Sequence, residues 1–208
     1  MIPFNKIYLT GKEKIYISKA LESQTSGNGY FTKKCSEFLE NLIGAKKVLL
    51  TPSCTAALEM SAILINIKPG DEIIIPSYTF VSTANAFVIR GAIPVFIDVI
   101  EDDLNIDVNK IEKAITKKTK AIITVHYAGN SCEMKKVKII AKKHGLYLIE
   151  DAAQSIMSFY DGNHLGSIGD LSTISFHQTK NISCGEGGAL VINSSKLSKR
   201  AEIIREKG

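Results

Sequence analysis

Short runs of β-branched and other apolar residues alternate along this chain with segments of helical periodicity. The apolar runs lie at residues 48–51, 72–75, 95–98, 121–125, 147–150, 173–176 and 189–192, and the helical segments at residues 12–22, 55–65, 107–116, 132–144 and from 195 onward. The runs are apolar almost throughout, as strands covered on both faces tend to be. We therefore predict an α/β fold with one seven-stranded, mostly parallel sheet between helices. In such a sheet, ligands bind at the carboxyl ends of the strands.

Composition and charge favour a globular protein that does not bind nucleic acid. With 208 residues, of which 45% are hydrophobic and 23% charged, the chain has the composition of one globular domain with a core. Its formal charge of +5 comes from scattered lysines rather than from a block of like charges. This pattern is typical of solvated helix faces, so we expect no nucleic-acid partner.

The sequence also lacks the patterns of a signal peptide and of a membrane-spanning segment. The amino terminus has no basic segment followed by an apolar run, and no stretch approaches the roughly 18 apolar residues of a membrane span. The four cysteines and four histidines show no metal-ligand spacing, so no metal site is predicted and the thiols indicate a reducing compartment. We expect a cytoplasmic protein without membrane insertion.

Two polar segments follow the first two apolar runs. The segment TPSCTAAL, at residues 51–58, leads from a strand into a helix, where free backbone amides beside Ser53 and Thr55 form a site for a phosphate group. The alternative is an ordinary helix cap by one of these hydroxyls. The segment PSYTF, at residues 76–80, places Tyr78 and Phe80 near the same sheet edge, where a ring could stack on a flat cofactor or pack in the core.

Asp151 and Lys180 together point to an aldehyde cofactor. Asp151 directly follows an apolar run, where a carboxylate can hold a pyridine nitrogen in its protonated form, although a helix N-cap would explain the same residue. Lys180 follows a later strand, five residues after Ser175, where its amine can bind an aldehyde covalently, although most lysines are surface residues. The order of these motifs favours pyridoxal phosphate, with Gln154 at the ring oxygen. Neither G-x-G-x-x-G after the first strand nor G-x-x-x-x-G-K-[ST] is present, which excludes the dinucleotide and P-loop alternatives.

Five segments, in their order along the chain, resemble the DegT/DnrJ family of sugar-nucleotide aminotransferases. They read TPSCTAALEM, PSYTF, EDAAQ, SFHQTKN and GEGG and lie at residues 51–60, 76–80, 150–154, 175–181 and 185–188. The resemblance covers essentially the whole chain. It implies the large domain of an aspartate-aminotransferase-like, pyridoxal-phosphate-dependent transferase.

The same resemblance implies a role for each candidate residue. Lys180 would bind the cofactor covalently, and Asp151 would contact its pyridine nitrogen. Relatives that dehydrate sugars carry histidine at the lysine position, so Lys180 favours transamination.

The remaining cofactor contacts are implied in the same way. Thr55, Ala56 and Ser175 would hold the phosphate, Phe80 would stack on the ring, and Gln154 would contact the ring oxygen.

The sequence resembles in particular the subgroup that acts in the synthesis of enterobacterial common antigen. Residues 1–5, 125–129 and 205–208 add to this resemblance. It implies transfer of the amino group of glutamate to dTDP-4-keto-6-deoxy-D-glucose, giving dTDP-4-amino-4,6-dideoxy-D-galactose. Another keto sugar nucleotide stays open as the substrate.

Family members are considerably longer than this chain. The resemblance implies that residues 1–208 are the cofactor-binding large domain, and that a carboxyl-terminal small domain, which helps to build a homodimer, is absent from the chain. Two hypotheses follow: an active aminotransferase whose other half is supplied separately or missing from the sequence, or a truncated inactive remnant that at most binds the cofactor or a partner.

Overall fold

A computed structural model describes residues 1–2, 5–23 and 27–206 of the chain. The family resemblance at Pro3, Phe4, Lys207 and Gly208 therefore lies outside the described residues. In chain order the elements are α1 (Glu13–Glu22), α2 (Tyr30–Ile43), β1 (Lys47–Thr51), α3 (Cys54–Leu64), β2 (Glu72–Pro76), α4 (Val81–Val88), β3 (Ile93–Ile97), α5 (Val108–Ala114), β4 (Thr119–Val125), the 3-10 turn η1 (Tyr127–Gly129), α6 (Met134–His144), β5 (Tyr147–Asp151), β6 (Phe159–Tyr160), β7 (Asn163–His164), β8 (Leu171–Ser175), β9 (Gly188–Ile192) and α7 (Ser195–Glu206).

The seven predicted strands form one sheet in the order β1-β9-β8-β5-β4-β2-β3, which confirms the predicted fold class. Strand β9 runs antiparallel to both of its neighbours, and the other pairs are parallel. The carboxyl ends of β1, β2, β4, β5 and β8 therefore meet at one edge, where β9 begins. At this edge Gly188 pairs with Thr51 on one side and with Ser175 on the other.

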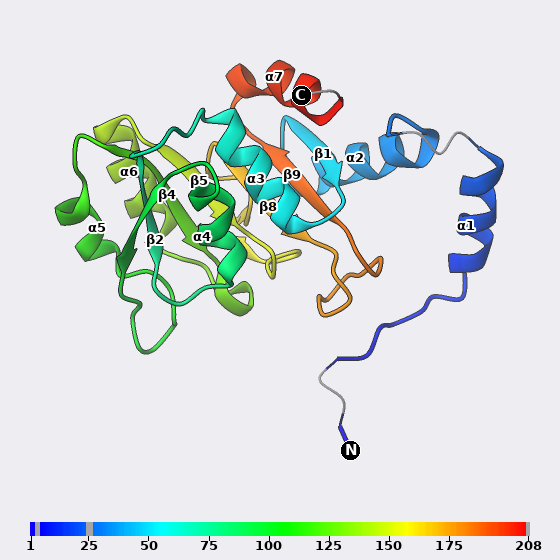
Figure 1. Ribbon diagram of the computed structural model, residues 1–208. Coiled ribbons are helices and arrows are strands. Elements are labelled where there is room, and N and C mark those ends of the chain that lie inside the picture. Colours follow the sequence, from blue (N-terminus) through cyan, green and yellow to red (C-terminus); the bar gives the residue numbers. More distant parts are fainter. Residues whose placement is uncertain (3–4, 24–26, 207–208) are drawn as a thin grey trace.

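Helices cover both faces of the sheet, which explains why the strands are apolar throughout. In β2, Ile73 and Ile75 pack into the cluster formed with α3, α4 and α7, whereas Ile74 packs into the cluster formed with α5 and α6. All three side chains are fully buried. A third cluster joins α2 to β1, β8 and β9. Figure 1 shows α3, α4 and α7 lying together on one side of the sheet.

The prediction missed two helices and a small hairpin. Helix α2 buries only Leu39 and Ile43 on a narrow stripe, and it ends at Gly44, whose positive φ of 76° suits a left-handed cap. Helix α4 is short and mostly small or polar, so its sequence carries little periodicity. The hairpin of β6 and β7 has two residues in each strand.

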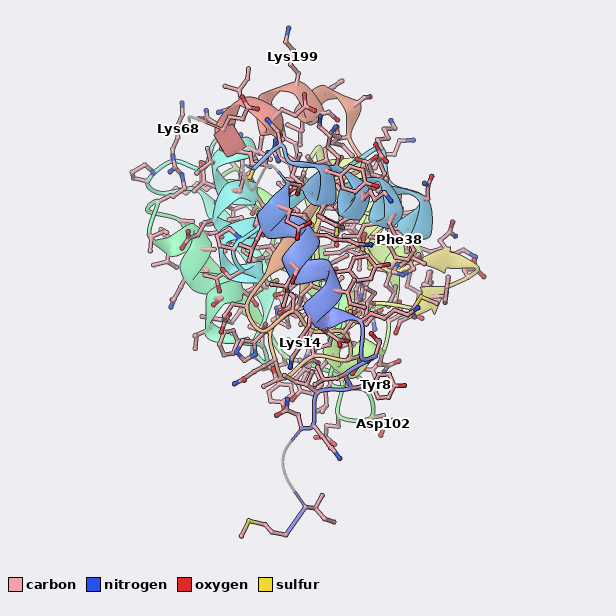
Figure 2. All side chains as sticks on the ribbon, turned by 90° about the vertical axis from the view of Figure 1, so that its right-hand side faces the viewer. Tyr8, Lys14, Phe38, Lys68, Asp102 and Lys199 are labelled. Carbon is pink, nitrogen blue, oxygen red and sulfur yellow. The ribbon has the colours of Figure 1, made fainter. Side chains whose placement is uncertain are left out.

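Helix α1 stands apart from the sheet. It has no buried residue, and Figure 1 shows it at the side of the molecule with the amino-terminal segment leading away from it. Figure 2, viewed from that side, shows α1 in front of the body, with Lys14 at the end that leads toward Tyr8. In the part of the chain that the structure describes, no helix is long and apolar enough to cross a membrane.

Candidate active site

A pocket of about 260 Å³ opens beside the carboxyl ends of β5 and β8. Its walls come from the segments that follow β4, β5 and β8, and they include Ala128, Gln154, Ser175, Thr179, Lys180 and Asn181. Three of the predicted site residues, Gln154, Ser175 and Lys180, therefore lie around one cavity. This is the sheet edge at which the strand pattern places a ligand.

Asp151 is the last residue of β5, and its side chain is buried beneath this edge. Its Oδ2 accepts a hydrogen bond of 2.7 Å from the Thr83 hydroxyl, and its Oδ1 accepts one of 3.2 Å from the Ala153 N–H. Burial raises the pKa of Asp151 above its usual value, although Thr83, Ala153 and the charge of Lys180 oppose the shift. A cation bound beside this carboxyl would stabilise its charged form.

Lys180 lies in the segment between β8 and β9 and is half-buried. Its backbone N–H donates to the His177 carbonyl over 2.9 Å. An isolated parallel β-bridge pairs His177 with Gly185 and so joins the two sides of the segment. Burial raises the pKa of the Cys54 thiol, as it does for Asp151, and the positive charge of Lys180 acts against both shifts. The ammonium group is therefore close enough to Asp151 for the two charges to interact.

The amino terminus of α3 presents open backbone donors at the same edge. The Ser53 hydroxyl accepts a hydrogen bond of 3.0 Å from the Ala56 N–H, so the helix cap that was the alternative to a phosphate site is present, with Ser53 as the capping residue. No described residue accepts from the N–H groups of Cys54 and Thr55, as expected in the first turn of a helix. The Thr55 hydroxyl donates to Ser82 over 2.8 Å. An anion can bind to such a terminus through its free amides and its positive dipole end.

Gly188 allows α3 to approach the sheet closely. A Cβ at this position would lie 2.4 Å from the Cys54 nitrogen and 2.4 Å from the Ser53 carbonyl carbon. Only glycine fits there, because any side chain would collide with this backbone. Ser175 pairs with Gly188 in the neighbouring strand, and its hydroxyl accepts a hydrogen bond of 3.3 Å from the His177 N–H.

Phe80 lies directly before α4, and its side chain is 72% exposed. The alternative that Phe80 packs in the core is therefore wrong. Its carbonyl accepts a hydrogen bond of 3.0 Å from the N–H of Thr83, the residue that contacts Asp151. Because the ring is exposed, a face of it is free to stack on a flat ligand.

Gln154 is fixed by the segment after β4. Its Oε1 accepts a hydrogen bond of 2.6 Å from the Ala128 N–H, so its amide nitrogen remains available to a ligand. Ala128 has a positive φ of 52°, which is unusual for a residue other than glycine.

A buried pair behind the site was not assigned from the sequence. The carboxylate of Glu150 lies 3.0 Å from Nε2 of His126 and accepts hydrogen bonds from the N–H groups of Gly166, Ile168 and Gly169. Burial opposes the charge of Glu150, but these hydrogen bonds hold its pKa below its usual value. No sequence spacing signals this pair, because its two members come from neighbouring strands.

These residues fit pyridoxal phosphate. They combine an open helix terminus for a phosphate, a buried carboxyl for a ring nitrogen, an exposed aromatic ring and a lysine at the pocket. Within residues 1–2, 5–23 and 27–206, no three His, Cys, Asp or Glu side chains are grouped as a metal site would require.

Comparisons with known proteins agree with this geometry. The model of the DegT/DnrJ/EryC1/StrS aminotransferase family matches residues 8–208. The chain is 40% identical over 201 residues to the spore coat polysaccharide biosynthesis protein SpsC of Bacillus subtilis, covering 96% of this chain and 52% of SpsC. It is 36% identical over 208 residues to the GDP-perosamine synthase of Escherichia coli O157:H7, covering 100% of this chain and 57% of the synthase.

A solved structure shows the same fold. The PLP-form of the putative sugar aminotransferase Spr1654 from Streptococcus pneumoniae superposes with a TM-score of 0.90 at 30% identity, over 99% of this chain and 56% of that protein. The chain spans about half the length of these relatives. Its sequence, its sheet and the residues at the sheet edge agree on one assignment: the chain belongs to the DegT/DnrJ/EryC1/StrS aminotransferase family.

Proposed function

We propose that this chain is the cofactor-binding part of a pyridoxal-phosphate-dependent aminotransferase that acts on a keto sugar nucleotide. The observation that carries the proposal is the position of Lys180 at a pocket beside the end of β5, the strand whose last residue is the buried Asp151. The family match and the relatives named for sugar biosynthesis support it. The net charge of +5 suits an anionic substrate.

Pyridoxal phosphate, when bound, supplies an aldehyde for amine transfer and a cationic ring that takes up electrons. Asp151 would accept a hydrogen bond from the protonated ring nitrogen. The positive charge on that nitrogen would offset the free-energy cost of burying the charged carboxylate of Asp151. At rest, the Lys180 amine would hold the cofactor through its aldehyde carbon, with water as the leaving group. During turnover its amine removes the proton from the α-carbon of the amino donor and returns a proton to C4 of the sugar.

The other residues hold and orient the cofactor. Thr55 and Ala56 at the start of α3, together with Ser175, bind the phosphate. The exposed Phe80 would stack on the ring, and the amide nitrogen of Gln154, whose oxygen accepts from Ala128, would donate to the ring oxygen. Ala56 would exchange its present bond with Ser53 for one with the phosphate.

For the substrates, our proposal is glutamate and dTDP-4-keto-6-deoxy-D-glucose, which makes the complete protein a dTDP-4-amino-4,6-dideoxygalactose transaminase. The sequence segments that resemble this subgroup support it. We further propose that the enzyme acts as a homodimer in the cytoplasm, and that the product enters polysaccharide synthesis, as the name of the relative SpsC suggests for that protein. A GDP-linked keto sugar is the second candidate, because a GDP-perosamine synthase is 36% identical to the chain.

An amine-transfer assay tests the proposal. The chain is incubated with pyridoxal phosphate, glutamate and either dTDP-4-keto-6-deoxy-D-glucose or its GDP-linked counterpart, and amino sugar nucleotides are measured by mass spectrometry. We expect the dTDP-linked amino sugar, and none from Lys180→Ala. Product from the GDP-linked sugar alone would favour the second candidate. A chain that binds the cofactor and forms neither product would support the hypothesis of an inactive remnant.

A further inference from the structure

Tyr78 and Tyr127 form a pair that the proposed roles of Lys180 and Asp151 do not use. Their hydroxyl oxygens lie 2.7 Å apart, and their ring centroids are 4.6 Å apart with the ring planes tilted by 42°. Tyr78 is 43% exposed, and Tyr127 is half-buried. The pair therefore lies at the surface, where burial of the rings alone does not explain it.

The pair lies next to the pocket. Tyr127 precedes Ala128, which forms part of the pocket wall, and Tyr78 lies two residues before Phe80. Because β2 and β4 are neighbours in the sheet, the segments that follow them meet at the carboxyl edge. The tyrosines thus connect the segment that carries Phe80 with the wall that holds Gln154.

The segment that carries Tyr127 is held in a strained conformation. Ala128 has a φ of 52°, a conformation that costs free energy in a residue with a side chain. The bond from its N–H to Gln154 holds it there, and a Cβ on the next residue, Gly129, would lie 2.7 Å from the Ser158 hydroxyl. The buried His126 anchors the other end. Such strain is typical of ligand sites, where the surrounding contacts fix one position of the chain.

The chemistry of the pair suits a neutral polyol. Only one of the two phenol protons can lie between the oxygens, so the other remains free to donate to a ligand. The hydrogen bond with Tyr78 holds the pKa of Tyr127 above its usual value, so the phenol of Tyr127 is neutral at neutral pH. The carboxylates of an amino-acid donor favour cations, and Lys180 is the only charged side chain among the described residues that line the pocket.

We propose that Tyr78 and Tyr127 form the binding site for the pyranose ring of the nucleotide sugar. Their free hydroxyl donates to a sugar hydroxyl, and their exposed ring faces contact the C–H groups of the sugar. This inference rests on the proposed function, since it names the part of that site that holds the second substrate.

Two probes that differ only in the sugar test the inference. The dissociation constants of dTDP-glucose and of dTDP are measured by calorimetric titration of the chain, with pyridoxal phosphate bound and fixed by borohydride, and again without the cofactor. Tyr78→Phe and Tyr127→Phe each remove one hydroxyl. Tyr147→Phe is the matched control, because Tyr147 begins β5 and so lies at the opposite edge of the sheet.

We expect each of the two site variants to weaken binding of dTDP-glucose about fivefold, the loss of one net hydrogen bond, with the constant for dTDP unchanged. Tyr147→Phe should change neither constant. The inference is overturned if the unmodified chain binds dTDP-glucose no more tightly than dTDP, or if the site variants weaken both probes equally or neither. Failure of the proposed function would appear elsewhere, as cofactor that is not fixed on Lys180, and would leave the ratio of the two constants measurable.

Discussion

The hydroxyl of Thr83, in α4, donates a 2.7 Å hydrogen bond to Oδ2 of Asp151, at the end of β5. The Thr83 oxygen also lies 2.8 Å from that of Thr79. The hydroxyls of Thr79 and Thr83 thus fix the orientation of the buried Asp151 carboxyl group. Thr83 therefore orients the group that is proposed to hold the cofactor ring, although it lies 68 residues away in the sequence.

Replacing Thr83 should weaken cofactor binding. Thr83→Val keeps the shape of the side chain and removes the donor, so the charged form of Asp151 loses a hydrogen bond. We expect the dissociation constant of pyridoxal phosphate, measured by absorbance titration, to rise about tenfold, because a hydrogen bond to a charged group is worth about 1.5–3 kcal/mol. Thr79→Val, which leaves the bond to Asp151 in place, should have a much smaller effect. Equal effects of the two variants would contradict this role of Thr83.

Asp151→Asn should separate stability from cofactor binding. Burial raises the folded-state pKa of Asp151, so ionisation destabilises the fold, and this cost appears as the pH rises through the unfolded value of about 3.9. The Asn variant lacks the cost. Without cofactor, its free energy of unfolding at pH 7 should therefore exceed that of the unmodified chain, and the difference should vanish below about pH 3.9. Its affinity for pyridoxal phosphate should fall. If the Asn variant were instead less stable than the unmodified chain at pH 7, the buried charge of Asp151 would not destabilise the fold.

Gly188→Ala should disrupt the phosphate site. The added Cβ would lie 2.4 Å from backbone atoms of Ser53 and Cys54, so the start of α3 must move away from β9. We expect a loss of stability of about 3 kcal/mol or more in urea unfolding, as overpacking against backbone costs, and weaker binding of pyridoxal phosphate.

Gly162→Ala provides the control for that experiment. Gly162 has a positive φ of 77° in open space, so the substitution adds strain without a clash. It should cost about 1 kcal/mol and leave cofactor affinity unchanged. The account of the phosphate site fails if Gly188→Ala binds the cofactor as well as Gly162→Ala does.

Glu150→Gln should destabilise the fold in a pH-dependent way. The folded-state pKa of Glu150 is lowered, so its charge stabilises the fold above the unfolded value of about 4.3, and this stabilisation is lost as the pH falls through the folded value. At pH 7 the variant should lose about 3 kcal/mol, because one member of a buried pair is removed. The loss should shrink below about pH 4.

Glu37→Gln is the matched control for this variant, since Glu37 is an exposed residue of α2. Its stability should stay within about 0.5 kcal/mol of the unmodified chain at every pH. A loss from Glu150→Gln that does not depend on pH would show that Glu150 acts through packing and not through its charge.

The sequence predicts the sheet because its central strands are covered on both faces, whereas the edge strand β3 exposes Ile93 and Phe96. Continuous apolar runs such as 72–75 reveal such strands directly. It also predicts the sheet edge at which the site lies, because Asp151 ends one strand and Lys180 follows another. Helix α4 escaped prediction, since it is only eight residues long and two of its four buried side chains, Ser82 and Thr83, are polar.

The spacing of residues along the sequence does not predict the contacts that complete the site. Thr83 meets Asp151, His126 meets Glu150 and Tyr78 meets Tyr127 because β5, β4 and β2 are neighbours, and the order of strands in a sheet differs from their order along the chain. Such pairs lie 24 to 68 residues apart. These contacts can be identified only once the order of the strands in the sheet is known.

We propose that Lys180 is the residue that binds the aldehyde of pyridoxal phosphate. The chain is incubated with the cofactor, reduced with borohydride and digested, and the modified peptide is identified by mass spectrometry. Lys46, Lys138, Lys142 and Lys196 line a separate cleft and serve as internal controls for nonspecific modification. We predict that the cofactor is fixed on the peptide that contains Lys180 and that Lys180→Ala abolishes the modification. Cofactor spread over these other lysines, or unchanged trapping in Lys180→Ala, would contradict the account.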